Sequence, residues 1–135
     1  MRFVFDTNVL ISSFLSPESI AAKTLNWAEN KGTILYPHAT LTEFTSVLSR
    51  PKFSKYISTE DIAGLIIRIK AVWLSVEIIN QIKLCRDPKD DKFIDIAING
   101  EASHIITGDN DLLVLHPIQN TSVINLRNFS DEFLA

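Results

Sequence analysis

The feature that most constrains the fold is an alternation of short apolar runs with longer segments of helical character. Apolar runs that predict β-strands lie at residues 2–5, 33–36, 76–79, 104–107 and 122–126. Segments with helical periodicity or helix-capping residues lie at 17–31, 40–49, 58–73, 90–99 and 128–134. Strands that alternate with helices form parallel βαβ units. We therefore expect an α/β fold, namely a three-layer α/β/α sandwich around a central, mostly parallel sheet.

Residues with preferred roles at helix ends set the expected boundaries. Ser16 as N-cap and Pro17 at the first helical position predict the start of the helix at 17–31, and Gly32 predicts its end. Pro51 ends the helix at 40–49. The polar stretches 6–8 and 108–111 each follow a strand, and we expect turns there. The chain contains no repeat or linker, so we expect one domain, residues 1–135.

The cysteine count and the apolar runs indicate where the protein is located in the cell, whereas the net charge does not identify its binding partner. The single cysteine, Cys85, excludes an intrachain disulfide and, with no leader at the start, favours a cytoplasmic protein. No apolar run approaches the ~20 residues that a membrane span requires, so we expect no membrane association. The net charge of −3 does not itself indicate a nucleic-acid partner. If five acids gather at a metal site, however, the remaining 11 of the 16 acids face 13 lysines and arginines.

Carboxylates from four separate segments are the candidates for chemistry. Asp6 and Asp109 each follow a predicted strand, at the edge where parallel sheets bind ligands. Glu43 lies near the apolar side of its helix, and Asp91 shares a largely apolar helix face with Asp95. Taken singly, each residue is also explained by a turn, a helix cap or a solvated surface acid, and for Asp6 and Glu43 alone we prefer that explanation.

Taken together, these acids favour a divalent cation. Two carboxylates about 5 Å apart repel by roughly 3 kcal/mol at an effective dielectric constant near 20, so a cluster of them needs positive charge. Oxygen ligands without His or Cys suit Mg²⁺ or Mn²⁺. Metal ions held in this way activate water and stabilise the charge that develops on a phosphodiester. The sequence therefore predicts a site for divalent cations.

Four segments that occur in order along the chain carry a family resemblance: FVFDTN (3–8), TEF through RPKF (42–53), DPKDDKF (87–93) and ITGDNDL (106–112). The chain resembles PIN-domain proteins, most of all the VapC-like toxins of bacterial and archaeal toxin–antitoxin systems. The resemblance implies a Mg²⁺- or Mn²⁺-dependent endoribonuclease. It also implies a homodimer and an antitoxin protein as partner.

The resemblance also assigns roles to individual residues of this chain. The catalytic, metal-binding acids would be Asp6, Glu43, Asp91 and Asp109, with Asp91 preferred to Asp90 because of its spacing to Thr107. Asp111 is expected to assist as a metal ligand. Three further residues are expected to contact the metal ligands without binding the metal themselves: Asn8, Asp95 and Thr107.

Basic residues near two of these segments are candidates for gripping the RNA backbone. Three follow the Glu43 helix and three flank Asp91: Arg50, Lys52, Lys55, Arg86, Lys89 and Lys92. A solvated surface without a ligand is the equally open alternative for them.

The helices at 40–49 and 58–73 also hold more apolar residues than one small sheet covers, which favours a dimer.

Three rival functions remain as alternatives. Phosphotransfer through Asp6, as in haloacid-dehalogenase-like phosphatases, calls for a second Asp two positions on, where this chain has Asn8. A receiver-like signalling module calls for a Lys after the last strand, and residues 122–128 contain none. A PIN scaffold that is catalytically idle would have no reason to keep a self-repelling set of acids.

Overall fold

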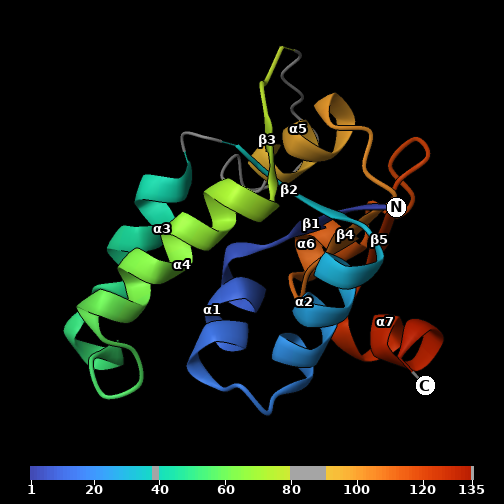
Figure 1. The fold of residues 1–135 in the computed structure, drawn as a ribbon. Coiled ribbons are helices and arrows are strands. Elements are labelled where there is room, and N and C mark those ends of the chain that lie inside the picture. Colours follow the sequence, from blue (N-terminus) through green and yellow to red (C-terminus); the bar gives the residue numbers. More distant parts are fainter. Residues whose placement is uncertain (38–39, 80–90, 135) are drawn as a thin grey trace.

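The protein is built on a parallel sheet with β1 at its centre (Figure 1). The computed structural model describes residues 1–37, 40–79 and 91–134, except for the side chains of residues 40, 43 and 91. In this part of the chain the strands are ordered β3-β2-β1-β4-β5, and all neighbouring pairs are parallel. Their bounds are β1 Arg2–Phe5, β2 Thr33–Pro37, β3 Leu74–Val76, β4 His104–Ile106 and β5 Ser122–Ile124.

Helices cover both faces of the sheet. Their bounds are α1 Thr7–Leu15, α2 Ile20–Lys31, α3 Thr40–Leu48, α4 Thr59–Val72, α5 Asp91–Asn99, α6 Asn110–Leu113 and α7 Leu126–Phe133, with a 3₁₀ turn η1 at Pro51–Phe53. Successive strand residues point to opposite faces. Phe3 and Phe5 therefore pack with α1–α4 and α7, whereas Val4 packs with α5 and α6. The predicted three-layer α/β/α sandwich is confirmed.

Two expectations about the first third of the chain are wrong. Residues 7–15 form α1 rather than a turn, because the Asp6 carboxylate accepts the first free N–H groups and so starts a helix. The following helix begins at Ile20, not residue 17, and its N-cap is Ser19. Ser16 instead ends α1, and its carbonyl accepts bonds from the Ser19 backbone and hydroxyl, which close a tight turn between the two helices.

Later boundaries differ as well: β5 ends at Ile124 rather than at residue 126, and α7 begins at Leu126 rather than at residue 128, because the Asn125 side chain caps the helix. β3 occupies Leu74–Val76 rather than 76–79, because its residues pair in register with Leu35–Pro37 of β2. A short helix, α6, lies where a turn was expected, and Asp109 caps it. By contrast, the helix start at Ser58 is confirmed, with reciprocal capping bonds between Ser58 and Asp61.

The helices α3 and α4 lie side by side as a hairpin at one end of the sheet (Figure 1). Leu48 of α3 and Ile69 of α4 are buried, whereas the outer side of α4 exposes Ile67 to 70 %. In the ranges that the structure covers, the helices are too short or too polar to cross a membrane.

Candidate active site

Asp6 is fixed at the carboxyl end of the central strand. Its backbone N–H donates to the Ile106 carbonyl (3.0 Å) and so extends the pairing of β1 with β4. Its side chain is buried, and Oδ1 accepts the N–H groups of Asn8 (2.7 Å) and Val9 (3.2 Å). One carboxylate oxygen thus serves as the N-cap of α1, which fixes the orientation of the whole group.

Thr107 joins Asp6 to the loop that carries Asp109. The Thr107 side chain is fully buried, and its hydroxyl donates to Asp6 Oδ2 at 2.6 Å. The hydroxyl oxygen of Thr107 also accepts a hydrogen bond from the backbone N–H of Asp109, at 3.0 Å. A hydroxyl has one proton, and an N–H group can only donate, so the Thr107 proton must point to Asp6. The threonine therefore ties the ends of β1 and β4 together through side chains.

Asp109 lines the same pocket as Asp6. It caps α6, since its Oδ1 accepts the N–H of Asp111 at 2.9 Å. An open pocket of about 450 Å³ beyond the carboxyl ends of β1 and β4 is lined by Asp6, Asn8, Ser12 and Asp109, among others. Two of the predicted acids thus meet at the edge of the sheet where α/β proteins bind ligands.

The donor set fits a hard divalent cation. A carboxylate offers about four acceptor positions, and donors among the described residues fill three on Asp6, which leaves one on Oδ2. Oxygen donors of this kind suit Mg²⁺ or Mn²⁺. Among the residues that the structure describes, no group of three His, Cys, Asp or Glu side chains could hold an ion. The side chains of Glu43 and Asp91 are not among those residues.

The backbone nevertheless places the elements that carry the other two acids. Glu43 belongs to α3, and Asp91 is the first residue of α5. Asp95 lies one turn later on α5 and is partly exposed. Neither Asp95 nor Asp111 is among the described residues that line the pocket with Asp6. The structure therefore brings Asp6, Asn8, Thr107 and Asp109 together, and Asp111 adjoins them through the bond from its N–H to Asp109 Oδ1.

The predicted basic residues fall into two places. Arg50, Lys52 and Lys55 are exposed at the far tip of the α3–α4 hairpin, where the Lys52 ammonium lies 5.0 Å from the centre of the Phe53 ring. Lys92 is partly exposed on α5, with its ammonium 5.1 Å from the centre of the Phe93 ring. Arg86 and Lys89 lie outside the described residues.

The sequence prediction missed Ser12, which lines the acid pocket from α1. Ser12 is exposed and lies four positions after Asn8, so both residues share one face of the helix. The spacing was visible in the sequence. It carried no meaning there, because the stretch after Asp6 was expected to be a turn.

Comparison with known proteins agrees with this geometry. The chain matches the PIN domain family over residues 2–111, a range that includes all of the predicted acids. It is also similar to the Uncharacterized protein MJ1680 of Methanocaldococcus jannaschii, with 34 % identity over 120 residues that cover 85 % of this chain and 75 % of the relative. PIN domains are generally nucleases that act on RNA or other nucleic acids, and they typically use divalent metal ions. On the strength of both matches, this chain belongs to the PIN-domain family.

Proposed function

We propose that the protein is a Mg²⁺- or Mn²⁺-dependent endoribonuclease of one domain, residues 1–135. The observation that carries the proposal is the bonded series Asp6–Thr107–Asp109, which holds two carboxylates at one pocket. Asp6, Glu43, Asp91 and Asp109 would bind the metal ion, with Asp111 assisting. When bound, such an ion supplies activation of water and neutralises charge that develops on the scissile phosphate.

The protein's own residues supply preorganisation. Thr107 and two backbone N–H groups hold the Asp6 carboxylate in one orientation before any ligand arrives. A site that is already oriented needs no rearrangement when charge develops during the reaction. Asn8 and Ser12 add polar groups to the wall of the same pocket and can contact the substrate there.

The RNA backbone would also contact cationic side chains outside the pocket. Lys92 lies on the helix that begins with Asp91, and Arg50, Lys52 and Lys55 lie on the hairpin that carries Glu43. Each phosphate that a Lys or Arg neutralises releases bound counterions, so RNA binding should weaken as salt rises. This dependence separates backbone contacts from an inert solvated surface.

The test is cleavage of mixed RNA and single-stranded DNA with Mg²⁺ or Mn²⁺, with and without EDTA. Asp6→Asn, Glu43→Gln, Asp91→Asn and Asp109→Asn should each remove most of the activity. Asp131→Asn is the matched control, because Asp131 is an exposed acid on α7. Equal cleavage by the wild type and Asp91→Asn at every metal concentration would refute the assigned site. No cleavage by the wild type under any condition would favour the idle scaffold.

The cellular role that we propose is that of a toxin in a toxin–antitoxin system, with the antitoxin a separate chain. The resemblance to VapC-like toxins supports it. Expression in a bacterial host should arrest growth, and Asp6→Asn should restore it. Normal growth at high levels of intact, active protein would exclude this role.

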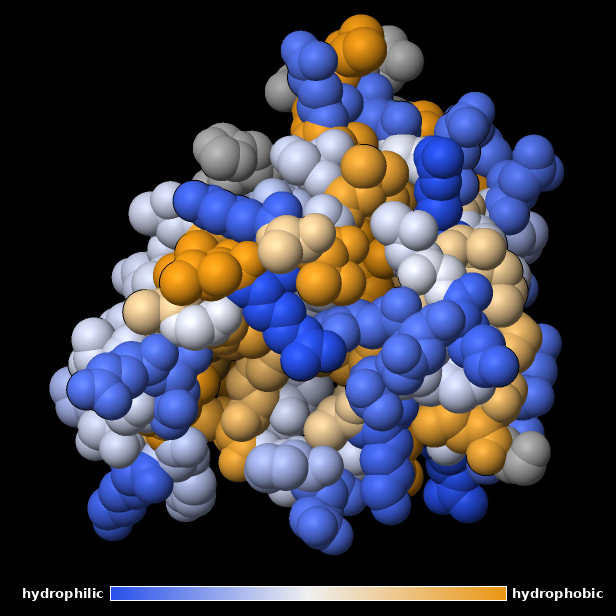
Figure 2. All heavy atoms as spheres, in the orientation of Figure 1, coloured by the Kyte–Doolittle hydropathy of each residue, from blue (hydrophilic) through white to orange (hydrophobic). Residues whose placement is uncertain are grey.

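We also propose a homodimer. Support comes from α4 and the start of β3, where Ile67, Val72 and Leu74 are 70 %, 52 % and 42 % exposed. Figure 2 shows apolar side chains gathered over this end of α4, with hydrophilic surface around them. Contiguous exposed apolar side chains of this kind mark interaction surfaces.

A further inference from the structure

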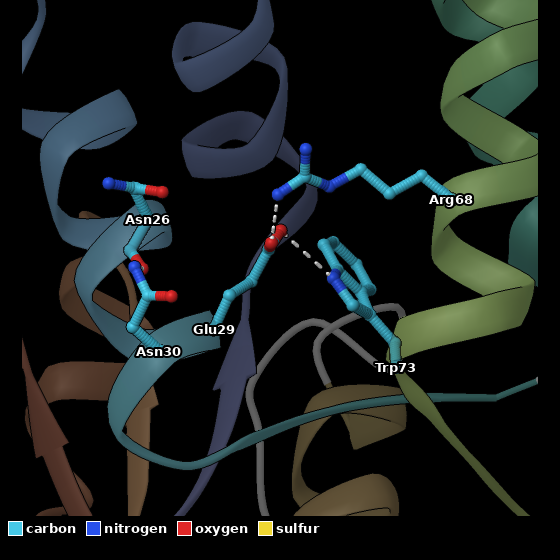
Figure 3. A network of polar contacts seen from close by, with 5 residues as sticks. All are labelled: Asn26, Glu29, Asn30, Arg68 and Trp73. Carbon is cyan, nitrogen blue, oxygen red and sulfur yellow. Dashed lines mark hydrogen bonds and ion pairs between the residues drawn. The ribbon is translucent and has the colours of Figure 1, made fainter.

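Glu29 makes a cross-helix contact that the catalytic proposal does not use. It lies near the end of α2, and its side chain is only 10 % exposed. One carboxylate oxygen accepts from the guanidinium of Arg68, and the other accepts from Trp73 Nε1 at 3.2 Å (Figure 3). A largely buried carboxylate costs free energy unless it is paired. The two donors therefore stabilise the Glu29 carboxylate, and the carboxylate in turn restrains the Arg68 and Trp73 side chains.

The contact joins the two parts of the protein that carry different acids. α2 packs on α1, whose N-cap is Asp6. Arg68 lies in the last turns of α4, and Trp73 is the C-cap of that helix. This end of α4 lies beside the first turns of α3, because Ile66 and Lys70 line one pocket together with residues 41, 42, 45 and 46. Glu43 belongs to those turns of α3.

Trp73 is the element through which Glu29 acts. Its ring is buried, meets Tyr36 of β2 edge-on at 6.4 Å between ring centres, and lines a small cavity with Phe44 of α3. The indole thus packs between Tyr36 of the sheet and the cavity that Phe44 of α3 also lines. The hydrogen bond to its N–H restrains the orientation of the ring, which faces the same cavity as Phe44 in the first turns of α3.

We propose that Glu29 is a positioning residue: through Trp73 it fixes the α3–α4 hairpin, and therefore Glu43, relative to Asp6. The inference rests on the proposed nuclease function. Arg68 is 59 % exposed, so solvent screens its side of the ion pair, and we expect this pair to position α4 less firmly than the bond to the buried indole does. The buried indole bond is the contact that matters, and this distinction makes the proposal testable.

Four variants separate the two contacts. Glu29→Leu removes both contacts, and Trp73→Phe removes the indole bond together with part of the buried ring. Arg68→Met removes the ion pair alone. Glu29→Gln keeps an oxygen that accepts the indole proton and is the conservative rescue. Ser19→Ala is the stability control, because it removes the N-cap of α2 without touching α4.

Kinetics with RNA and Mn²⁺ should be measured well below the melting temperature of each variant. We expect Glu29→Leu and Trp73→Phe to lower kcat about ten- to hundredfold, the cost of a small misplacement of a reacting group, with KM nearly unchanged. Arg68→Met and Glu29→Gln should retain most of the wild-type kcat. The proposal is overturned if Glu29→Leu lowers kcat no more than Ser19→Ala does.

Hydrogen exchange supplies a readout that does not depend on activity. Glu29→Leu and Trp73→Phe should speed amide exchange in a peptide spanning α3 and leave α1 unchanged, whereas Ser19→Ala should not affect α3. Unchanged exchange in α3 would overturn the positioning role even if the variants lost activity. A wild type that cuts no RNA would refute the proposed function, and the exchange experiment would still test the contact.

Discussion

Replacing Thr107 with Val should damage the protein more than the loss of one hydroxyl ordinarily does. Val has nearly the same shape as Thr, so the change leaves packing almost intact. It removes the donor to Asp6 Oδ2 and the acceptor for the Asp109 N–H, in a position with no exposed surface. The effect therefore reports on the bonded link between the two acids.

The structure gives the expected size of the effect. A hydrogen bond to a charged group contributes about 1.5–3 kcal/mol, and an N–H left without a partner adds about 1 kcal/mol when only partly buried. We expect the free energy of unfolding to fall by about 2–4 kcal/mol. A chain of 135 residues unfolds with an entropy near 0.28 kcal/mol/K, so each kcal/mol shifts Tm by about 3.5 °C. Thr107→Val should melt about 7–14 °C below the wild type.

Two other buried threonines provide matched controls. The Thr121 hydroxyl donates to the Ala102 carbonyl at 2.8 Å, a neutral bond away from the acids, so Thr121→Val should cost only about 1 kcal/mol. The Thr24 hydroxyl is buried and has no partner among the described residues. Burial of an unpaired hydroxyl is unfavourable, so Thr24→Val should leave stability unchanged or raise it by about 1 kcal/mol.

The assay is thermal unfolding of the wild type and the three Val variants, in EDTA and in excess Mn²⁺. From the most to the least stable, the order should be Thr24→Val, wild type, Thr121→Val and Thr107→Val. Only Thr107→Val should reduce the rise in Tm that Mn²⁺ causes. A Thr107→Val variant that melts with Thr121→Val and responds fully to the metal would refute the reasoning.

Three further predictions concern metal, pH and assembly. Mn²⁺ at a hundredfold excess over its Kd should stabilise the wild type by about 2.7 kcal/mol, and Asp109→Asn should lose most of that gain; equal Tm shifts for both proteins would contradict the site. Burial among Phe3, Phe129 and Phe133 lowers the pKa of His104 below 6.5; Glu132 opposes that shift and the N-terminal ammonium adds to it. The folded state then binds fewer protons than the unfolded chain, so stability should rise as pH approaches 6.5 from below and level off above it, and His104→Phe should flatten that rise in thermal melts. Light scattering at tens of micromolar protein should give the mass of a dimer for the wild type and of a monomer for Ile67→Glu; a wild-type monomer would exclude the dimer.

The sequence predicted the sheet and the meeting of Asp6 with Asp109 because both follow from local patterns. Apolar runs marked the strands, and acids that follow parallel strands must emerge at one edge. The sequence could not distinguish a turn from a helix start after Asp6, because the same bond from a side-chain oxygen to a nearby N–H serves both. α6 was missed because four residues show no periodicity.

Other features depend on how distant elements pack. The Thr107 bridge requires the register in which Asp6 N–H meets the Ile106 carbonyl, which residue patterns do not encode. The bond between Glu29 and Trp73 spans 44 positions and two helices. Each residue alone looks ordinary in the sequence, an acid on a helix and an aromatic at its end. Only the packing of α2 and α4 against the sheet gives the pair a meaning.

The central place of β1 has a consequence for the order of synthesis. β1 is made before β4, and the bond from Thr107 to Asp6 spans 101 positions. A ribosome that adds about 5–20 residues per second needs roughly 5–20 s to cover that separation. During this interval the first strand has no β4 beside it, and the Asp6 carboxylate has no Thr107 to orient it. The bond that orients the Asp6 carboxylate can therefore form only after the chain has been made as far as Thr107.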